Sequence, residues 1–110
     1  TAEKIAFARF FDGRVTAVVG THTHVQTADE TILERGTAFI TDVGMTGPTD
    51  GVIGMDVASS LRRFVDRLPS SFATAQGRAM INAVRIEVDP TTGRALSIAR
   101  IRFVEEAPFG

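Results

Sequence analysis

Apolar and polar positions alternate along the chain with two different periods, and each period predicts a different kind of element. Near the start, apolar residues recur every three to four positions, which predicts a helix over residues 1–12 with phenylalanines facing a core. Residues 15–19 form a mainly apolar run, which is typical of a central strand covered on both faces. A second amphipathic helix is predicted over residues 57–67, and Asp56 is suited to cap its N-terminus.

The clearest strand pair lies near the C-terminus. Residues 79–88 and 94–104 read as strands, and the Asp-Pro-Thr-Thr-Gly segment at 89–93 has the composition of a turn, so the three segments predict a β-hairpin. Two shorter strands are expected around residues 31–33 and over 37–41, joined by a tight turn. Helices and strands in this order predict a mixed α/β (α+β) fold.

Composition and charge narrow the function classes. A chain of 110 residues is at most one domain. Its 12 basic and 13 acidic residues leave a net charge of −1, so neither a nucleic-acid polymer nor an anionic membrane is expected as a partner. Cysteine is absent, which excludes disulfides and thiolate metal sites. No segment reads as a membrane span or a signal peptide, so a cytoplasmic location is the default expectation.

The only two histidines of the chain, His22 and His24, follow the apolar run. In an extended segment, residues two positions apart share a face, so the two imidazoles could bind one metal or one metal each. Thr21 and Thr23 would then point away from the metals. The alternative interpretation is that the histidines are polar residues at a strand end, bonded to the backbone.

Asp42 ends the predicted strand 37–41 and precedes a glycine-rich loop at residues 43–51. Its carboxylate could accept a hydrogen bond from the second ring nitrogen of a metal-bound histidine. Alternatively, it could simply cap the loop, since aspartate is common in such turns. The loop itself is either a surface turn or a wall of the active site.

Three blocks of sequence resemble one known family. GTHTHVQTAD (20–29), GTAFITDVGMTGP (36–48) and VIGM (52–55) are similar to the YmdB-like bacterial metallophosphoesterases of the calcineurin-like superfamily. Members of that family act on 2′,3′-cyclic nucleotides. The resemblance extends over nearly the whole chain, and it favours the metal-site interpretation of the histidines.

The resemblance implies a fold and a metal site. The fold would be two facing β-sheets flanked by helices, and this chain would be the C-terminal half of that metallophosphoesterase domain. The site would hold two divalent metal ions, such as iron or manganese, with His22 and His24 as ligands, one for each metal. The other ligands and the proton donor would precede residue 1, so we expect no catalytic residue within this chain and no activity from the isolated 110 residues.

The implied function is a metal-dependent phosphodiesterase. It would hydrolyse small phosphodiesters, 2′,3′-cyclic nucleotides among them, through attack on phosphorus by a hydroxide that the metals activate. Apolar faces left uncovered would favour pairing, so a homo-oligomer is expected. The competing hypothesis is a non-catalytic α/β half-domain that serves assembly or partner binding, with its histidines satisfied by hydrogen bonds.

Overall fold

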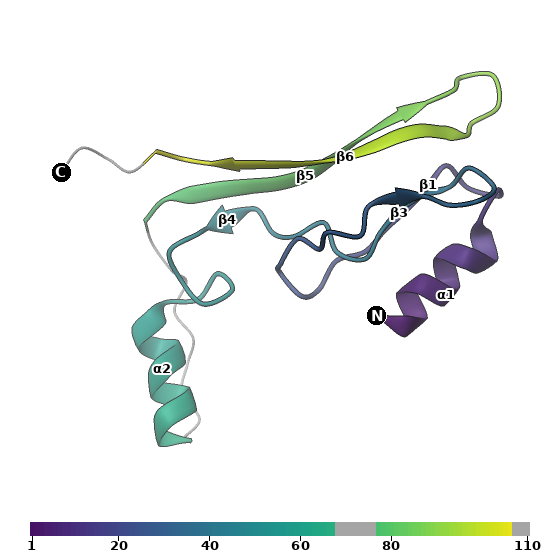
Figure 1. The fold of residues 1–110 in the computed structure, drawn as a ribbon. Helices are drawn as coiled ribbons and strands as arrows, with labels where there is room; N and C mark the ends of the chain where they lie inside the picture. The colour runs from purple at the N-terminus through teal and green to yellow at the C-terminus, as the bar shows by residue number, and fades with distance from the viewer. Residues whose placement is uncertain (68–76, 107–110) are drawn as a thin grey trace. The chain divides into compact units, whose positions relative to one another are not determined.

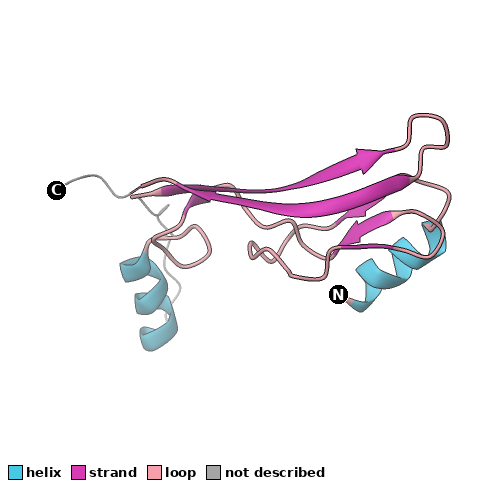
Figure 2. Cartoon of the chain, turned by 45° about the horizontal axis from the view of Figure 1, so that its top comes forward, coloured by secondary structure: helices cyan, strands magenta, loops and turns pink. Residues whose placement is uncertain are grey.

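The structure is a computed structural model, and it describes residues 1–67 and 77–106. Helices and strands are mixed along the chain, as Figures 1 and 2 show, which confirms the predicted α+β class. In order, the elements are α1 (Ala2–Phe11), β1 (Ala17–Val19), β2 (Thr31–Ile32), β3 (Ala38–Ile40), β4 (Gly47–Pro48), α2 (Val57–Asp66), β5 (Ala79–Val88) and β6 (Ala95–Val104). Both helices and the C-terminal hairpin lie where the sequence predicts them.

The first sheet has the strand order β1-β3-β2. β1 runs parallel to β3, with Val18 opposite Phe39, and β2 pairs antiparallel with the same strand. Among residues 1–67 and 77–106, β1 lies at the edge of this sheet and Val19 is 47% exposed, so the described strands do not place residues 15–19 at the centre as predicted. The central strand is β3, and all three of its residues are buried. An apolar run indicates burial, but it does not say how many neighbours a strand will have.

The chain divides into two compact units. The first comprises Thr1–Met45 and Asn82–Arg102, and the second comprises Thr46–Ile81 and Phe103–Gly110. The first unit contains the whole β1-β3-β2 sheet and the candidate residues Thr21, His22, Thr23, His24 and Asp42, whereas residues 46–51 of the glycine-rich loop belong to the second unit.

Within the first unit, three layers lie on one another. Figures 1 and 2 show α1 on one face of the β1-β3-β2 sheet and the β5–β6 hairpin along the other. The buried cluster of this unit consists of Ala8 from α1, Leu33 and Phe39, with Val18 packed against it. Apolar side chains from the helix and the sheet thus form the small core that supports the strand ends.

Hydrogen bonds join the hairpin to the first sheet at two ends. Near the hairpin tip, the Ala95 N–H donates to the Gly36 carbonyl at 2.9 Å. Further along, the Gln26 side-chain amide donates to the carbonyl of Ala83 at 3.0 Å and to that of Ile101 at 3.3 Å. Because Gln26 follows the histidine pair by two residues, the loop that carries the histidines is attached to both strands of the hairpin.

In the second unit, β4 pairs antiparallel with the first residues of β5, a pairing that the sequence did not predict. Asp50 and Arg78 form an ion pair at 2.9 Å beside it. Asp56 caps α2 as predicted, since its carboxylate accepts a hydrogen bond from the Ser59 N–H at 2.9 Å.

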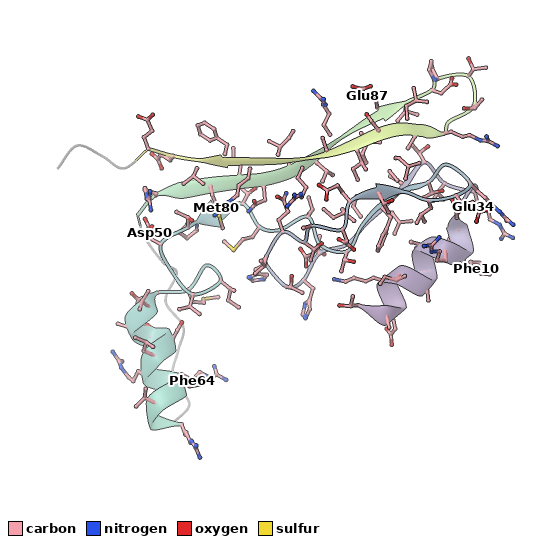
Figure 3. All side chains as sticks on the ribbon, viewed as in Figure 1. Phe10, Glu34, Asp50, Phe64, Met80 and Glu87 are labelled. Atoms are coloured by element: carbon pink, nitrogen blue, oxygen red, sulfur yellow. The ribbon has the colours of Figure 1, made fainter. Side chains whose placement is uncertain are left out.

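The expectation that both helices bury an apolar face is not met within the described residues. On α1 only Ala8 is buried, whereas Phe7 is 55% exposed and Phe10 is 64% exposed. On α2, Phe64 is 84% exposed, and Figure 3 shows its position on the helix. The sequence pattern identifies which helix face is apolar, but the described residues supply little to cover it.

Candidate metal centre

Gly20 fixes the end of β1 and the start of the histidine loop, residues 21–25. Its N–H donates to the Ile40 carbonyl at 3.0 Å, and its own carbonyl accepts from the Val43 N–H at 2.9 Å. A Cβ added to Gly20 would lie only 1.9 Å from the Thr41 carbonyl oxygen. Only glycine allows the two backbones to approach this closely, so it determines where the histidine loop leaves the sheet.

The histidine loop is not extended, which corrects the geometry assumed from the sequence. His22 has a φ of 108° and His24 a φ of 68°, and both side chains are exposed. Positive φ is uncommon for residues other than glycine, and it costs roughly 1–3 kcal/mol at each position. Strand alternation therefore does not decide where Thr21 and Thr23 point, and the surrounding contacts must hold the two histidines in place.

Asp42 supplies the main contact that holds this loop. Its side chain is fully buried, and one carboxylate oxygen accepts from both the N–H and the hydroxyl of Thr23, each at 2.7 Å. The other oxygen accepts from the Gly44 N–H at 2.8 Å, so Asp42 also caps the glycine-rich loop. The hydrogen bond from Gly44 agrees with the capping interpretation of Asp42, whereas its predicted hydrogen bond to a metal-bound histidine stays a prediction. In addition, the carboxylate binds the residue between the two histidines, which the sequence did not predict.

Lys4 completes the surroundings of this carboxylate. Its ammonium lies 3.7 Å from Asp42 and donates a hydrogen bond to the Thr21 carbonyl at 2.5 Å. Burial raises the pKa of the Asp42 carboxyl, but the hydrogen bonds from Thr23 and Gly44 and the charge of Lys4 outweigh it, so the pKa is lowered. Asp42 is therefore ionised at neutral pH. Sequence analysis did not select Lys4, because a lysine on a helix resembles any solvated charge.

A second group of hydrogen bonds ties the segment after the histidines to the end of β3. The Thr27 N–H donates to the Asp42 carbonyl at 3.0 Å, and its hydroxyl donates to the Asp29 carboxylate at 2.6 Å. Asp29 also accepts from the N–H and the hydroxyl of Thr41. Burial raises the pKa of Asp29, but these hydrogen bonds outweigh it and lower the pKa. The spacing Thr-x-Asp, a local hydrogen-bonding pattern, is the sequence signal that could have found this group.

The two histidines provide only part of a metal site. Among residues 1–67 and 77–106, no three histidine, aspartate or glutamate side chains gather closely enough to hold a metal ion. A catalytic metal normally has at least three protein ligands. The exposed imidazoles on a fixed loop fit a metal as ligand types, but a complete site needs ligands in addition to those described.

The comparisons with known proteins identify the family. A sequence model of the YmdB-like proteins matches residues 1–101. The chain belongs to the YmdB-like family. It is 50% identical over 109 residues to the 2′,3′-cyclic-nucleotide 2′-phosphodiesterase of Bacillus subtilis strain 168, an alignment that covers 99% of this chain and 41% of the relative. The resemblance seen in the three sequence blocks is thereby confirmed.

Solved structures of similar proteins have the same fold as this YmdB-like chain. A hypothetical protein from Thermus thermophilus superposes with a TM-score of 0.89 at 43% identity, over 96% of this chain and 41% of the other. A structure described as a novel phosphatase from Mycoplasma pneumoniae gives 0.90 at 44% identity, over 97% and 38%. The chain thus spans about two fifths of the length of each relative.

Proposed function

We propose that this YmdB-like chain supplies the paired-histidine part of a two-metal site, in an enzyme that hydrolyses small phosphodiesters such as 2′,3′-cyclic nucleotides. The observation that carries the proposal is the histidine loop, which the buried Asp42 carboxylate holds in a strained conformation with both imidazoles exposed. Strain of this kind gathers at functional sites. The family membership and the activity named for the Bacillus subtilis relative add support.

Four residues of this chain have a role in the proposed site. His22 and His24 would each hold one divalent metal ion, such as iron or manganese, through a neutral ring nitrogen. Bound metals supply an activated water and positive charge against the phosphate oxygens. Asp42 and Thr23 orient the loop. The remaining ligands and the proton donor would come from residues outside these 110, so we propose that the chain is the C-terminal part of the whole enzyme domain.

The proposed partner is a small molecule. No helix among the described residues is long and apolar enough to cross a membrane. The net charge of −1 gives no general attraction to a nucleic-acid polymer, so we keep the small phosphodiester as substrate. The homo-oligomer and the cytoplasmic location stay predictions.

The test measures metal content and hydrolysis in the same preparations of the whole enzyme that contains this chain. His22→Ala and His24→Ala should each lower bound metal by about one equivalent, and each should lower hydrolysis of 2′,3′-cyclic AMP by at least about 100-fold, since even indirect partners of metal ligands matter by 10–100-fold. Val25→Ala is the matched control, because Val25 lies in the same loop and is exposed. Unchanged metal content in both histidine variants would exclude them as ligands.

A non-catalytic half-domain is the second candidate. The exposed apolar side chains of α2, Phe64 and Val65 foremost, favour it because such surfaces mark sites of association. Metal analysis separates the two candidates. A full-length protein purified without bound transition metal and without hydrolysis would support an assembly role, whereas about two metals in each full-length molecule would support the enzyme.

A further inference from the structure

A hollow of about 440 Å³ lies at the end of β1 and β3 opposite the histidine loop. Both strands run in the same direction, so the histidine loop and Asp42 follow their carboxyl ends, whereas this hollow collects the turns before their amino ends. Residues at the tip of the β5–β6 hairpin also line it. We call it the arginine pocket, because its lining includes Arg14, Arg35 and Arg94 together with Gly13, Gly36 and Gly93.

The charges of the arginine pocket are not balanced by ion pairs. In the part of the chain that the structure describes, none of Arg14, Arg35 and Arg94 forms one, and no acidic side chain lines the pocket. Asp12 is buried and accepts the main-chain N–H groups of Arg35 at 2.9 Å and Thr37 at 3.3 Å. Glu34 precedes Arg35 in the chain, and the Asp89 N–H donates to the Arg94 carbonyl at 2.9 Å, so these carboxylates offset part of the positive charge.

The side chains of Arg35 and Arg94 pack closely against the backbone of two glycines. A Cβ on Gly13 would lie 2.9 Å from the Cβ of Arg35, and a Cβ on Gly36 would lie 3.0 Å from the Cγ of Arg94. The first carbons of both side chains therefore contact main chain. The guanidinium of Arg14 lies 5.1 Å from the ring centre of Phe10. Such packing reduces the freedom that an arginine loses when it binds an anion.

We propose that the arginine pocket binds a small phosphate-bearing molecule, either pyrophosphate or a mononucleotide. Guanidinium groups bind phosphate with two parallel hydrogen bonds, and a hollow lined by three arginines and by no acidic side chain favours an anion. The volume is within the range of small-molecule sites, roughly 300–1,000 Å³. The net charge of −1 disfavours a nucleic-acid polymer as the occupant. This proposal does not depend on the metal site.

The experiment titrates pyrophosphate and AMP separately into purified protein from which divalent ions have been removed by a chelator. Isothermal titration calorimetry should show saturable binding that weakens as salt rises, because the attraction is electrostatic. Arg35→Gln and Arg94→Gln should each weaken it by about tenfold. Arg102→Gln is the matched control, because Arg102 is an exposed arginine on β6 that does not line the pocket, and its binding should be unchanged.

Two further variants make the outcomes decisive. Arg94→Lys keeps the charge and the packing stem, so it should bind more tightly than Arg94→Gln if the guanidinium and its charge both matter. His22→Ala should bind as the unsubstituted protein does. Binding of both probes supports recognition of the phosphate, and binding of AMP alone supports a mononucleotide. Absence of binding, an equal loss in Arg102→Gln, or loss in His22→Ala with retention in the arginine variants would each overturn the proposal.

Discussion

A buried aspartate holds a loop at each end of the β1–β3 pair, but the two loops expose side chains of different chemistry. At each end a buried aspartate accepts main-chain N–H groups from a neighbouring loop: Asp42 binds Thr23 and Gly44, and Asp12 binds Arg35 and Thr37. At the carboxyl end this places at the surface the two histidines that we propose as metal ligands. At the amino end it places the arginines that we propose to bind an anion. A buried carboxylate thus fixes the backbone, and the exposed side chains decide the chemistry.

The ends differ in where they store backbone strain. At the amino end the residues with positive φ are glycines, such as Gly13 at 84° and Gly36 at 96°, for which this conformation carries no steric penalty. At the carboxyl end they include His22 and His24. A strained residue persists only where its surroundings hold it, so the comparison indicates that the position of the histidines depends on their loop contacts more than that of the arginines.

The largest expected effect comes from Gly20→Ala. The new Cβ would meet the Thr41 carbonyl at 1.9 Å, so β1 and β3 must separate, and we expect a loss of about 3 kcal/mol or more in unfolding free energy. Gly93→Ala is the control at the other end, since its Cβ meets nothing closer than 3.8 Å and only its positive φ is unfavourable, at about 1 kcal/mol. Urea unfolding followed by circular dichroism measures both. Equal losses would mean that the close backbone approach is not a constraint.

Exchanging the two aspartates for asparagine tests whether the ends act independently. Asp42→Asn should weaken metal binding by about tenfold and leave pyrophosphate binding unchanged, because it loosens only the histidine loop. Asp12→Asn should do the reverse. Each should also cost about 2 kcal/mol of stability, since hydrogen bonds to a charged group are lost. Metal titration and calorimetry on both variants provide the four measurements, and a variant that weakens both ligands equally would contradict the separation.

Thr23→Val removes one of the two hydrogen bonds to Asp42 and keeps the branched shape of the side chain. The main-chain bond remains, so we expect a smaller effect, roughly a threefold to tenfold loss of metal affinity. Thr23→Ser restores the hydroxyl and should recover the affinity. A merely structural role would reduce stability in Thr23→Val without changing the affinity of the folded protein.

The smallest expected effect is a pH dependence from Asp29. Its pKa is lowered in the folded state by hydrogen bonds from Thr27 and Thr41, despite the opposing effect of burial. Its contribution to stability is therefore present above the ordinary aspartate pKa of about 3.9 and is lost as pH falls through the folded value. Unfolding measured between about pH 5 and pH 3 should show a shallower decline in Asp29→Asn than in the unsubstituted protein. Parallel declines would contradict this assignment.

Local periodicity predicted the elements but not their neighbours. The helices and the 79–88/94–104 hairpin were predicted because each repeats one pattern over about ten residues. β4 was missed because Gly47–Pro48 becomes a strand only by pairing with Ala79 and Met80, far along the chain. The same limit explains why β1 was placed at the centre of its sheet. Strand order is a tertiary property that a short apolar run does not contain.

The candidate site was predicted in part. His22, His24 and Asp42 were selected from their residue types and their places after strands, and the structure brings Asp42 into the histidine loop through Thr23. The positive φ of the histidines was not predictable, because it depends on contacts with β3 and Lys4. No local sequence pattern links Arg14, Arg35 and Arg94. Each therefore resembles an ordinary solvated charge until the fold brings the three residues together.

The arginine pocket also has a consequence for how the protein is made. It draws on turns near residues 14, 35 and 94, so it cannot exist until nearly all of this chain has been synthesised and the last hairpin has docked. A phosphate compound that binds there recognises only the completed fold, and it would stabilise that fold by mass action. Occupancy of the pocket would then report whether the first unit has folded completely.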